Sequence, residues 1–108
     1  MKKTLLRAVA ALALVTITAT PALLATSDDG AEQRLVYHKK CQSCHGKDGV
    51  PKESGSGSAS FNDPNWQNQT DLETIMEVIK NGKGAMKGFE GKLSEEEMLA
   101  VAKYIKTL

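Results

Sequence analysis

Apolar residues recur at helical spacing in two segments of the second half of the chain. The first segment begins at Thr70 and ends before Gly82. Its apolar positions are Leu72, Ile75, Met76 and Ile79. The second follows Ser94 and carries the apolar positions Met98, Leu99, Val101, Ala102, Ile105 and Leu108. Thr70 and Ser94 are each followed three residues later by glutamate, which is the capping-box pattern of a helix start. We therefore predict one helix between Thr70 and Gly82 and another from Ser94 to the end of the chain.

A further helix is predicted at residues 31–40, with Leu35, Val36 and Tyr37 facing the core. Residues 46–69 show no such periodicity and include a run of serine, glycine and alanine at residues 54–60. A connection of that length is uncommon in a small domain unless it has a function or wraps a ligand. The alternation that is typical of strands does not appear. The expected fold class is therefore all-α, with three or four short helices and long connections.

The N-terminal segment has the pattern of a secretory signal peptide. Three basic residues precede small and aliphatic residues at positions 8–17, and a second run of small residues follows Pro21. We predict cleavage after Ala25, or alternatively after Ala22, so residues 1–25 are the signal peptide and residues 26–108 are the mature domain. An uncleaved membrane anchor is the alternative, which the threonines and the proline of this segment disfavour. The mature protein is therefore expected in the periplasm or an equivalent space outside the cytoplasm.

Composition and charge add two constraints. Residues 1–25 contain three of the 14 basic residues and no acidic one, so the remaining chain has 11 basic and 13 acidic side chains, a net charge of −2. This balance excludes a strongly basic nucleic-acid-binding protein. A domain of about 80 residues commonly needs disulfides, a metal or a cofactor, and this one has only two cysteines and few aromatic residues. We therefore expect a bound group in its interior.

Residues 41–45 carry the most informative chemistry, a Cys-x-x-Cys-His motif formed by Cys41, Cys44 and His45. Thiols three positions apart on a helical turn project to one side, and the imidazole follows directly. This geometry suits thioether bonds from both cysteines to one haem, with His45 as an axial iron ligand, so we predict a covalent haem c. The alternatives are a redox-active dithiol, which needs a parallel sheet around it, a structural zinc site, which needs four ligands, and a plain disulfide.

The second axial ligand has to come from a distant part of the sequence. Met86 is the favoured candidate, because residues 81–91 contain four glycines that allow its thioether to reach inward. Met76 and Met98 lie on the apolar stripes and are expected to pack in the core. His38 is a weaker candidate, since it lies on the same side of the attachment motif as His45.

Further pieces of sequence accompany the motif: Tyr37 four residues before the first cysteine, Gly46 after the histidine, and residues 61–66, 81–86 and 101–108. With these pieces, the chain from about residue 31 to residue 108 resembles a small bacterial class I cytochrome c with one haem. The resemblance implies the small cytochrome c fold, in which the first and last helices cross near the haem. It also implies specific roles: Tyr37, Val101 and Tyr104 lie at this crossing, and Trp66 is a buried indole near the haem propionates.

The chain departs from the family pattern at two positions, and one alternative role remains for the indole. Gln33 stands where the family usually has glycine at the helix crossing, and Lys87 follows the methionine where the family usually has proline. Neither departure removes an expected iron ligand. The alternative for Trp66 is an ordinary core tryptophan.

A histidine and a thioether would fill both axial positions of the iron and leave none for oxygen or a substrate. We therefore expect a carrier of single electrons and not an enzyme. The other ring nitrogen of His45 is expected to donate a hydrogen bond to a backbone carbonyl near Pro51, which makes Pro51 a further haem-pocket candidate. The alternative function is a haem sensor or a peroxidase-like enzyme, in which the Met86 ligand is labile or absent.

Several lysines lie near the attachment motif or near Met86: Lys39, Lys40, Lys47, Lys83 and Lys87. A positive rim around an exposed haem edge would steer the protein toward acidic patches on redox partners. An ordinary solvated surface is the alternative. The expected partners are membrane cytochrome complexes, oxidases or reductases. The mature protein is expected to be a monomer that binds neither nucleic acid nor, stably, a membrane.

Overall fold

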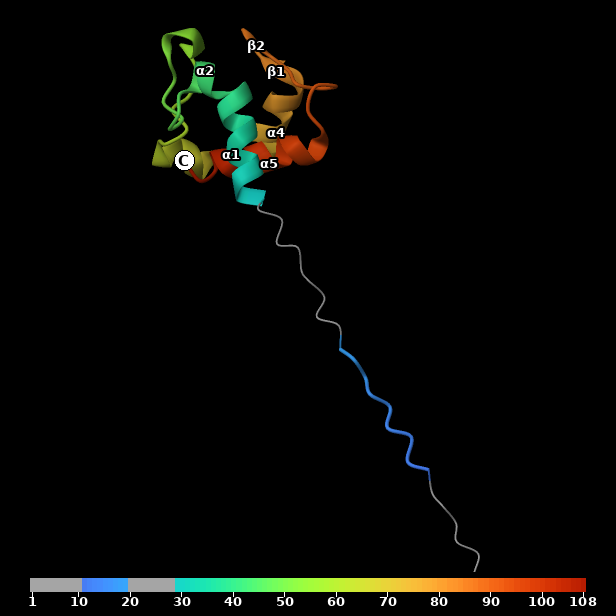
Figure 1. Cartoon of the computed structure of the whole chain (residues 1–108). Helices are drawn as coiled ribbons and strands as arrows, with labels where there is room; N and C mark the ends of the chain where they lie inside the picture. Colours follow the sequence, from blue (N-terminus) through green and yellow to red (C-terminus); the bar gives the residue numbers. More distant parts are fainter. Residues whose placement is uncertain (1–10, 20–28) are drawn as a thin grey trace, which may run out of the picture.

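The computed structural model describes residues 11–19 and 29–108. Its elements in chain order are α1 (Asp29–Lys40), α2 (Gln42–His45), the 3₁₀ turn η1 (Glu53–Gly55), α3 (Pro64–Gln69), α4 (Leu72–Asn81), β1 (Gly82–Lys83), β2 (Met86–Lys87) and α5 (Glu95–Ile105). Helix α5 packs against both α1 and α4, and α2 continues from the end of α1 (Figure 1). The described residues are thus mostly helical, as expected, with five α-helices in place of the three or four predicted.

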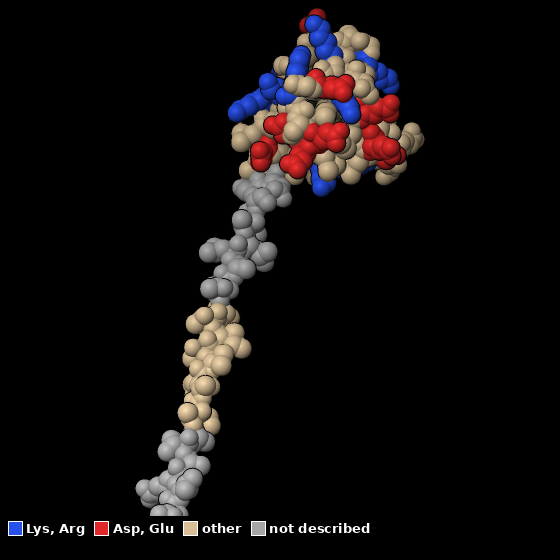
Figure 2. Space-filling view, turned by 90° about the vertical axis from the view of Figure 1, so that its right-hand side faces the viewer, with Lys and Arg blue, Asp and Glu red and all other residues tan. Residues whose placement is uncertain are grey.

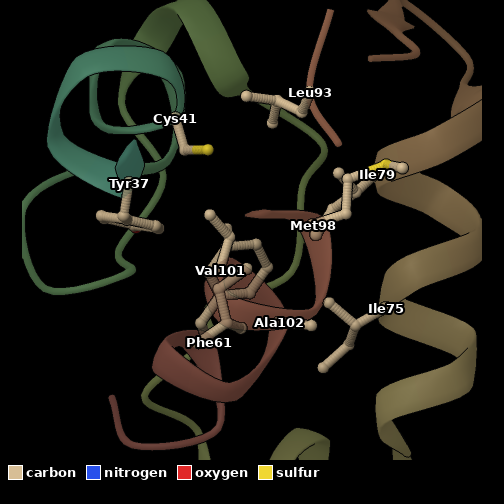
Figure 3. Packing of buried hydrophobic residues seen from close by; sticks show 10 residues of the cluster. Tyr37, Cys41, Phe61, Ile75, Ile79, Leu93, Met98, Val101 and Ala102 are labelled. Carbon is tan, nitrogen blue, oxygen red and sulfur yellow. The ribbon is translucent and has the colours of Figure 1, made fainter. Parts of the chain in front are cut away.

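Helix α5 begins as the sequence predicts. The Ser94 hydroxyl accepts a hydrogen bond of 3.1 Å from the Glu97 amide, and the Glu97 carboxylate accepts one of 2.7 Å from the Ser94 amide. This reciprocal pair satisfies two amides that have no partner within the helix. Behind it, the apolar stripe contributes to the core through Met98, Val101, Ala102 and Ile105 (Figure 3).

The N-cap of helix α4 lies one residue after the predicted position. Asp71, not Thr70, is the N-cap, and its carboxylate accepts a hydrogen bond of 2.8 Å from the Thr74 amide. A carboxylate at this position satisfies a free amide and also interacts favourably with the positive end of the helix dipole, which a hydroxyl does not. The stripe predicted for this helix is confirmed, since Ile75 and Ile79 are buried.

Helices α1 and α5 cross at the most buried part of the molecule. Tyr37 and Val101 are fully buried, and the ring centroids of Tyr37 and Tyr104 lie 5.1 Å apart in an edge arrangement. The crossing therefore uses the residues that the family resemblance implies. The prediction that Leu35 faces the core is wrong, because 54% of this residue is exposed. Successive helix positions are about 100° apart, so a single face cannot bury Leu35, Val36 and Tyr37 together.

The predicted irregular segment, residues 46–69, contains η1 and α3. Helix α3 starts at an Asp-Pro pair, in which the Asp63 carboxylate accepts a hydrogen bond of 2.9 Å from the Asn65 amide and Pro64 occupies the first turn. This pair is a helix-start signal, but six residues are too few for an apolar stripe to reveal a helix. At the end of α3, the Lys106 ammonium binds two backbone carbonyls and so joins α3 to the end of α5.

The predicted signal peptide lies mostly outside the described residues. Of residues 1–25, the structure describes residues 11–19, which form no regular element and are exposed. The candidate cleavage positions, residues 22 and 25, lie outside the described part. Within residues 11–19 and 29–108, no helix combines the length and apolar character needed to cross a membrane. The division into residues 1–25 and 26–108 therefore stays a prediction.

Candidate functional site

The Cys-x-x-Cys-His motif forms a short helical turn at the end of α1. Cys41 is the N-cap of α2, and the His45 amide donates a hydrogen bond of 2.9 Å to the Cys41 carbonyl. Cys41 is buried and its sulfur points into the core, whereas Cys44 is half-buried (Figure 3). Both thiols are free, so the plain disulfide is not formed. The turn therefore presents two thiols and an imidazole from one short stretch of backbone.

The serine- and glycine-rich segment packs against this turn. The Lys52 amide donates a hydrogen bond of 2.9 Å to the Cys44 carbonyl, and the Ser54 hydroxyl donates one of 2.7 Å to the Ser43 carbonyl. Gly55 comes so close that a β-carbon at this position would lie 2.2 Å from the Cys44 carbonyl oxygen. Only glycine allows this approach without moving the backbone. Residues 46–69, in which no periodicity predicted a helix, therefore support the attachment turn.

Two residues of the same connection hold the His45 ring. Its Nδ1 lies 3.0 Å from the Ser58 hydroxyl oxygen. The ring also stacks on Phe61, with centroids 4.7 Å apart and planes 22° from parallel. Burial lowers the pKa of His45, so its imidazole is neutral at neutral pH, the form in which a ring nitrogen can bind a metal.

The structure does not contain the expected hydrogen bond from His45 to a carbonyl near Pro51. The His45 Nδ1 contacts the Ser58 hydroxyl instead. Pro51 is half-buried in the connection, and the Ser58 hydroxyl occupies the place at Nδ1 that was assigned to that carbonyl. The physical reason is the path of the chain, which continues past Pro51 and returns to the histidine only at Ser58 and Phe61.

The state of the thiols disfavours a redox-active dithiol. Burial, and after it the charge of Cys44, raises the pKa of Cys41 to about 11, so the thiol stays protonated at neutral pH. Reactive Cys-x-x-Cys motifs instead lower the pKa of a cysteine to produce a thiolate. The strands of the described residues form one short antiparallel hairpin and not a parallel sheet. In the described part of the chain, no three His, Cys, Asp or Glu side chains group around a common metal position.

Met86 lies on a tight hairpin instead of the flexible loop that its neighbouring glycines suggested. Strands β1 and β2 pair antiparallel, with Met86 opposite Lys83. Gly82 and Gly84 have φ values of 79° and 57°, and a β-carbon at Gly82 would lie 2.4 Å from the Met86 carbonyl oxygen. These glycines therefore permit a left-handed turn and a close backbone approach. The result is a constrained support for the methionine.

Met86 differs from the other methionines of the domain because it neither belongs to the core cluster nor packs against it. Met98 belongs to that cluster and Met76 packs against it, as their apolar stripes predict. Met86 is half-buried. Helix α2 and the β1–β2 hairpin lie at the same end of the folded domain (Figure 1). The fold therefore brings this methionine to the end of the domain that carries the attachment turn.

Tyr37 connects the helix crossing to the attachment turn. Its phenol donates a hydrogen bond of 2.8 Å to the Gly46 carbonyl, directly after the motif. Burial is the main reason why the pKa of Tyr37 is raised, and the phenol therefore keeps its proton. Tyr104 packs against it from α5.

Trp66 and His38 are the remaining aromatic candidates, and both are half-buried. Trp66, half-buried on α3, lies with its ring centroid 4.8 Å from that of Phe61, whose other neighbour is the His45 ring. Trp66 also packs against the core, as the core-tryptophan alternative expects, and its position near the haem propionates stays a prediction. The Nδ1 of His38 forms a hydrogen bond with the Gln42 side-chain oxygen.

All five candidate docking lysines are exposed: Lys39, Lys40, Lys47, Lys83 and Lys87. On the face shown in Figure 2, basic side chains gather mostly toward the end of the domain where α2 and the hairpin lie. Acidic side chains on the same face gather farther from that end. On this face, the basic side chains therefore lie mostly toward one end and the acidic ones mostly away from it.

Sequence reasoning missed two residues of the site, Ser58 and Phe61. Phe61 is one of only two phenylalanines and lies five residues before the only tryptophan, so it was a detectable candidate. Ser58 is one of four serines in residues 54–60, and no local pattern distinguishes it from the other three.

Comparison with known proteins gives a consistent result. The family model described as cytochrome C oxidase, cbb3-type, subunit III matches residues 28–105. The cytochrome c6 of a Synechococcus species is 37% identical over 107 residues, which cover 95% of this chain and 90% of that protein. The cytochrome c6 of Leptolyngbya boryana is 31% identical over 77 residues, which cover 71% and 89%.

Two further matches concern an oxidase subunit and a solved structure. The cbb3-type cytochrome c oxidase subunit FixP of a Bradyrhizobium species is 31% identical over 81 residues, which cover 74% of this chain but only 28% of that subunit. The solved structure of the c-type cytochrome KustC0563 superimposes with a TM-score of 0.66 at 35% identity, covering 69% of this chain and 94% of that chain.

Proposed function

Because the chain belongs to the class I cytochrome c family and is an electron-transfer protein with covalently bound haem c, we propose that His45 and Met86 are its two iron ligands. Cys41 and Cys44 form the thioether bonds of this proposal, and the protein carries single electrons between redox partners. The observation that supports it best is the single turn that presents two free thiols beside a neutral imidazole.

The residues present fit a haem held through two sulfurs. Cys41 and Cys44 are unpaired thiols three positions apart, which is the chemical state that thioether formation consumes. The His45 Nδ1 is already engaged by Ser58, so Nε2 is the nitrogen available to a metal. When bound, the haem supplies a metal centre that accepts and releases one electron at a time.

Met86 determines whether the protein is a carrier or an enzyme. The Met86 thioether and the His45 imidazole would together hold the metal, which would leave no free position for oxygen or a substrate. Neutral imidazole and thioether ligands also favour the reduced metal, so we expect a positive reduction potential. The constrained hairpin supports this role, because a stiff backbone keeps the thioether from dissociating easily.

Location and partners complete the proposal. Residues 1–25 direct export to the periplasm, where a soluble monomer meets membrane oxidases, reductases or cytochrome complexes. The exposed lysines near the attachment turn support docking to acidic patches on those partners, because opposite charges steer the encounter of two proteins.

The Met86→Ala variant tests the proposed ligation, with Met76→Leu as the matched control. The oxidised wild-type holoprotein should show a sulfur-to-iron charge-transfer band, which Met86→Ala loses and Met76→Leu keeps. The reduction potential of Met86→Ala should fall, because water or another hard ligand replaces the thioether. A wild-type holoprotein that is high-spin and responds to added ligands would contradict this proposal and support a sensor or a peroxidase-like enzyme.

A further inference from the structure

We propose that Ser58 is a positioning residue for the iron ligand: its hydroxyl oxygen accepts the Nδ1 proton of His45 and so directs Nε2 to the metal. This inference rests on the proposed role of His45 as iron ligand and extends it by naming the group that orients the ring.

The contact of Ser58 with the next residue favours one direction for its hydrogen bond with His45. The Ser58 hydroxyl donates its single proton to the Ala59 carbonyl at 3.2 Å. Because the hydroxyl proton is used toward Ala59, we assign the Ser58 oxygen as the acceptor toward the His45 Nδ1 at 3.0 Å and place the shared proton on the imidazole. A neutral imidazole with its proton on Nδ1 has its lone pair on Nε2, which is the form that a metal binds.

The ring of His45 is constrained in two independent directions. The Ser58 contact lies at the ring edge, and the Phe61 ring covers one face with centroids 4.7 Å apart. An edge contact limits rotation within the plane of the ring, and a face contact limits tilting out of that plane. Together they leave the imidazole in one orientation before any metal is bound, which is the role that partners of metal-ligating histidines have.

The backbone holds Ser58 at this place through a series of short connections. The Ser58 amide donates to the Gly55 carbonyl at 3.0 Å, the Gly55 amide to the Lys52 carbonyl at 2.9 Å, and the Lys52 amide to the Cys44 carbonyl at 2.9 Å. The series therefore begins at Ser58 and ends on the residue next to His45. The hydroxyl and the imidazole are parts of one hydrogen-bonded ring, so the contact does not depend on a freely moving loop.

The neighbouring serines provide a matched control, because they make other contacts. Ser54 donates to the Ser43 carbonyl, and Ser60 donates to the Asn62 side-chain oxygen. Neither is bonded to the histidine. A role in positioning the ligand therefore predicts an effect of Ser58 that a substitution of Ser60 does not reproduce.

Removal of the acceptor should shift the balance between oxidised and reduced metal. A hydrogen bond from Nδ1 raises the basicity of the imidazole, which stabilises the oxidised form. Its loss in Ser58→Ala should weaken the preference for the oxidised form by about threefold to tenfold, an upward potential shift of roughly 30 to 60 mV for a one-electron couple.

The experiment compares the holoproteins Ser58→Ala, Ser58→Thr, Ser58→Val and Ser60→Ala by redox titration and by NMR of the reduced protein. Threonine and valine have the same shape and differ in the hydroxyl, so Ser58→Thr should retain the wild-type potential and Ser58→Val should shift like Ser58→Ala. The His45 Nδ1 proton should exchange with solvent faster in the alanine and valine variants only. Equal potentials and exchange rates for Ser58→Thr and Ser58→Val would overturn the role of Ser58.

A His45→Ala variant separates this inference from the proposed function. If His45→Ala keeps the low-spin spectrum of the wild type, then His45 is not an iron ligand and the proposed ligation fails. If His45→Ala loses that spectrum while Ser58→Ala behaves like Ser60→Ala in both measurements, the ligation stands and only the role of Ser58 is wrong.

Discussion

The fully buried phenol of Tyr37 donates a hydrogen bond of 2.8 Å to the backbone carbonyl of Gly46. This contact joins the crossing of α1 and α5 to the residue that follows the attachment turn. One side chain therefore packs in the core and also forms a hydrogen bond with the backbone of the site.

Tyr37→Phe should lower the free energy of unfolding of the holoprotein by about 1–2 kcal/mol, because a buried carbonyl loses its strongest donor. Denaturant unfolding followed by far-UV circular dichroism measures this change. Tyr104→Phe is the control, since Tyr104 lies against Tyr37 but is only half-buried. An equal loss in both variants would show that ring packing, and not the Gly46 contact, accounts for the stability.

Gly55→Ala should destabilise the attachment turn. The new β-carbon would lie 2.2 Å from the Cys44 carbonyl oxygen, so α2 or η1 has to move. We expect a loss of about 1–3 kcal/mol in the free energy of unfolding, together with a lower yield of haem-bearing protein. Gly30→Ala, where no atom lies within 4 Å of the added carbon, should be neutral. A Gly55→Ala protein as stable as Gly30→Ala would contradict the close packing of this connection.

The N-cap of α4 should make stability depend on acid pH. Hydrogen bonds from Thr74 lower the pKa of Asp71 below the ordinary aspartate value of about 3.9. A lowered folded-state pKa means that the carboxylate stabilises the protein above about pH 4, and that this contribution is lost as the pH falls through the folded-state pKa.

Thermal unfolding of wild type and Asp71→Asn at a series of pH values measures this contribution of Asp71. Asparagine keeps a cap acceptor but does not titrate, so the wild type should be the more stable protein at pH 7 and its advantage should shrink in acid. Asp71→Ala should be less stable than Asp71→Asn at every pH. A constant difference between wild type and Asp71→Asn from pH 7 to pH 2 would be inconsistent with the lowered pKa.

The lysines near the hairpin should control the rate of encounter with acidic redox partners. The double variant Lys83→Glu and Lys87→Glu should lower the bimolecular electron-transfer rate about tenfold at low salt, and the wild-type rate should fall as salt rises. Stopped-flow kinetics with an acidic partner protein measures both effects. Lys103→Glu, an exposed change on α5, is the control for net charge when compared with either single variant, Lys83→Glu or Lys87→Glu. A wild-type rate independent of salt would rule out a basic docking surface.

The predicted helix starts differ in how well they match the structure. The reciprocal bonds of Ser94 and Glu97 match the predicted cap of α5, whereas Asp71 replaces Thr70 as the N-cap of α4 because a charged cap competes well with the adjacent hydroxyl. Helix α3 has a readable start at Asp63 and Pro64. Its short length hid it from an analysis of periodicity.

The sequence by itself determined the three longer helices, the attachment motif and the family, because caps, apolar stripes and the Cys-x-x-Cys-His spacing act between residues close together in the chain. The tertiary structure decided that Ser58 meets His45, that Leu35 faces solvent and that Met86 lies on a paired hairpin. These outcomes depend on the path of a connection and on which helix face is covered. Local side-chain chemistry does not specify either, because the relevant contacts join residues that the fold alone brings together.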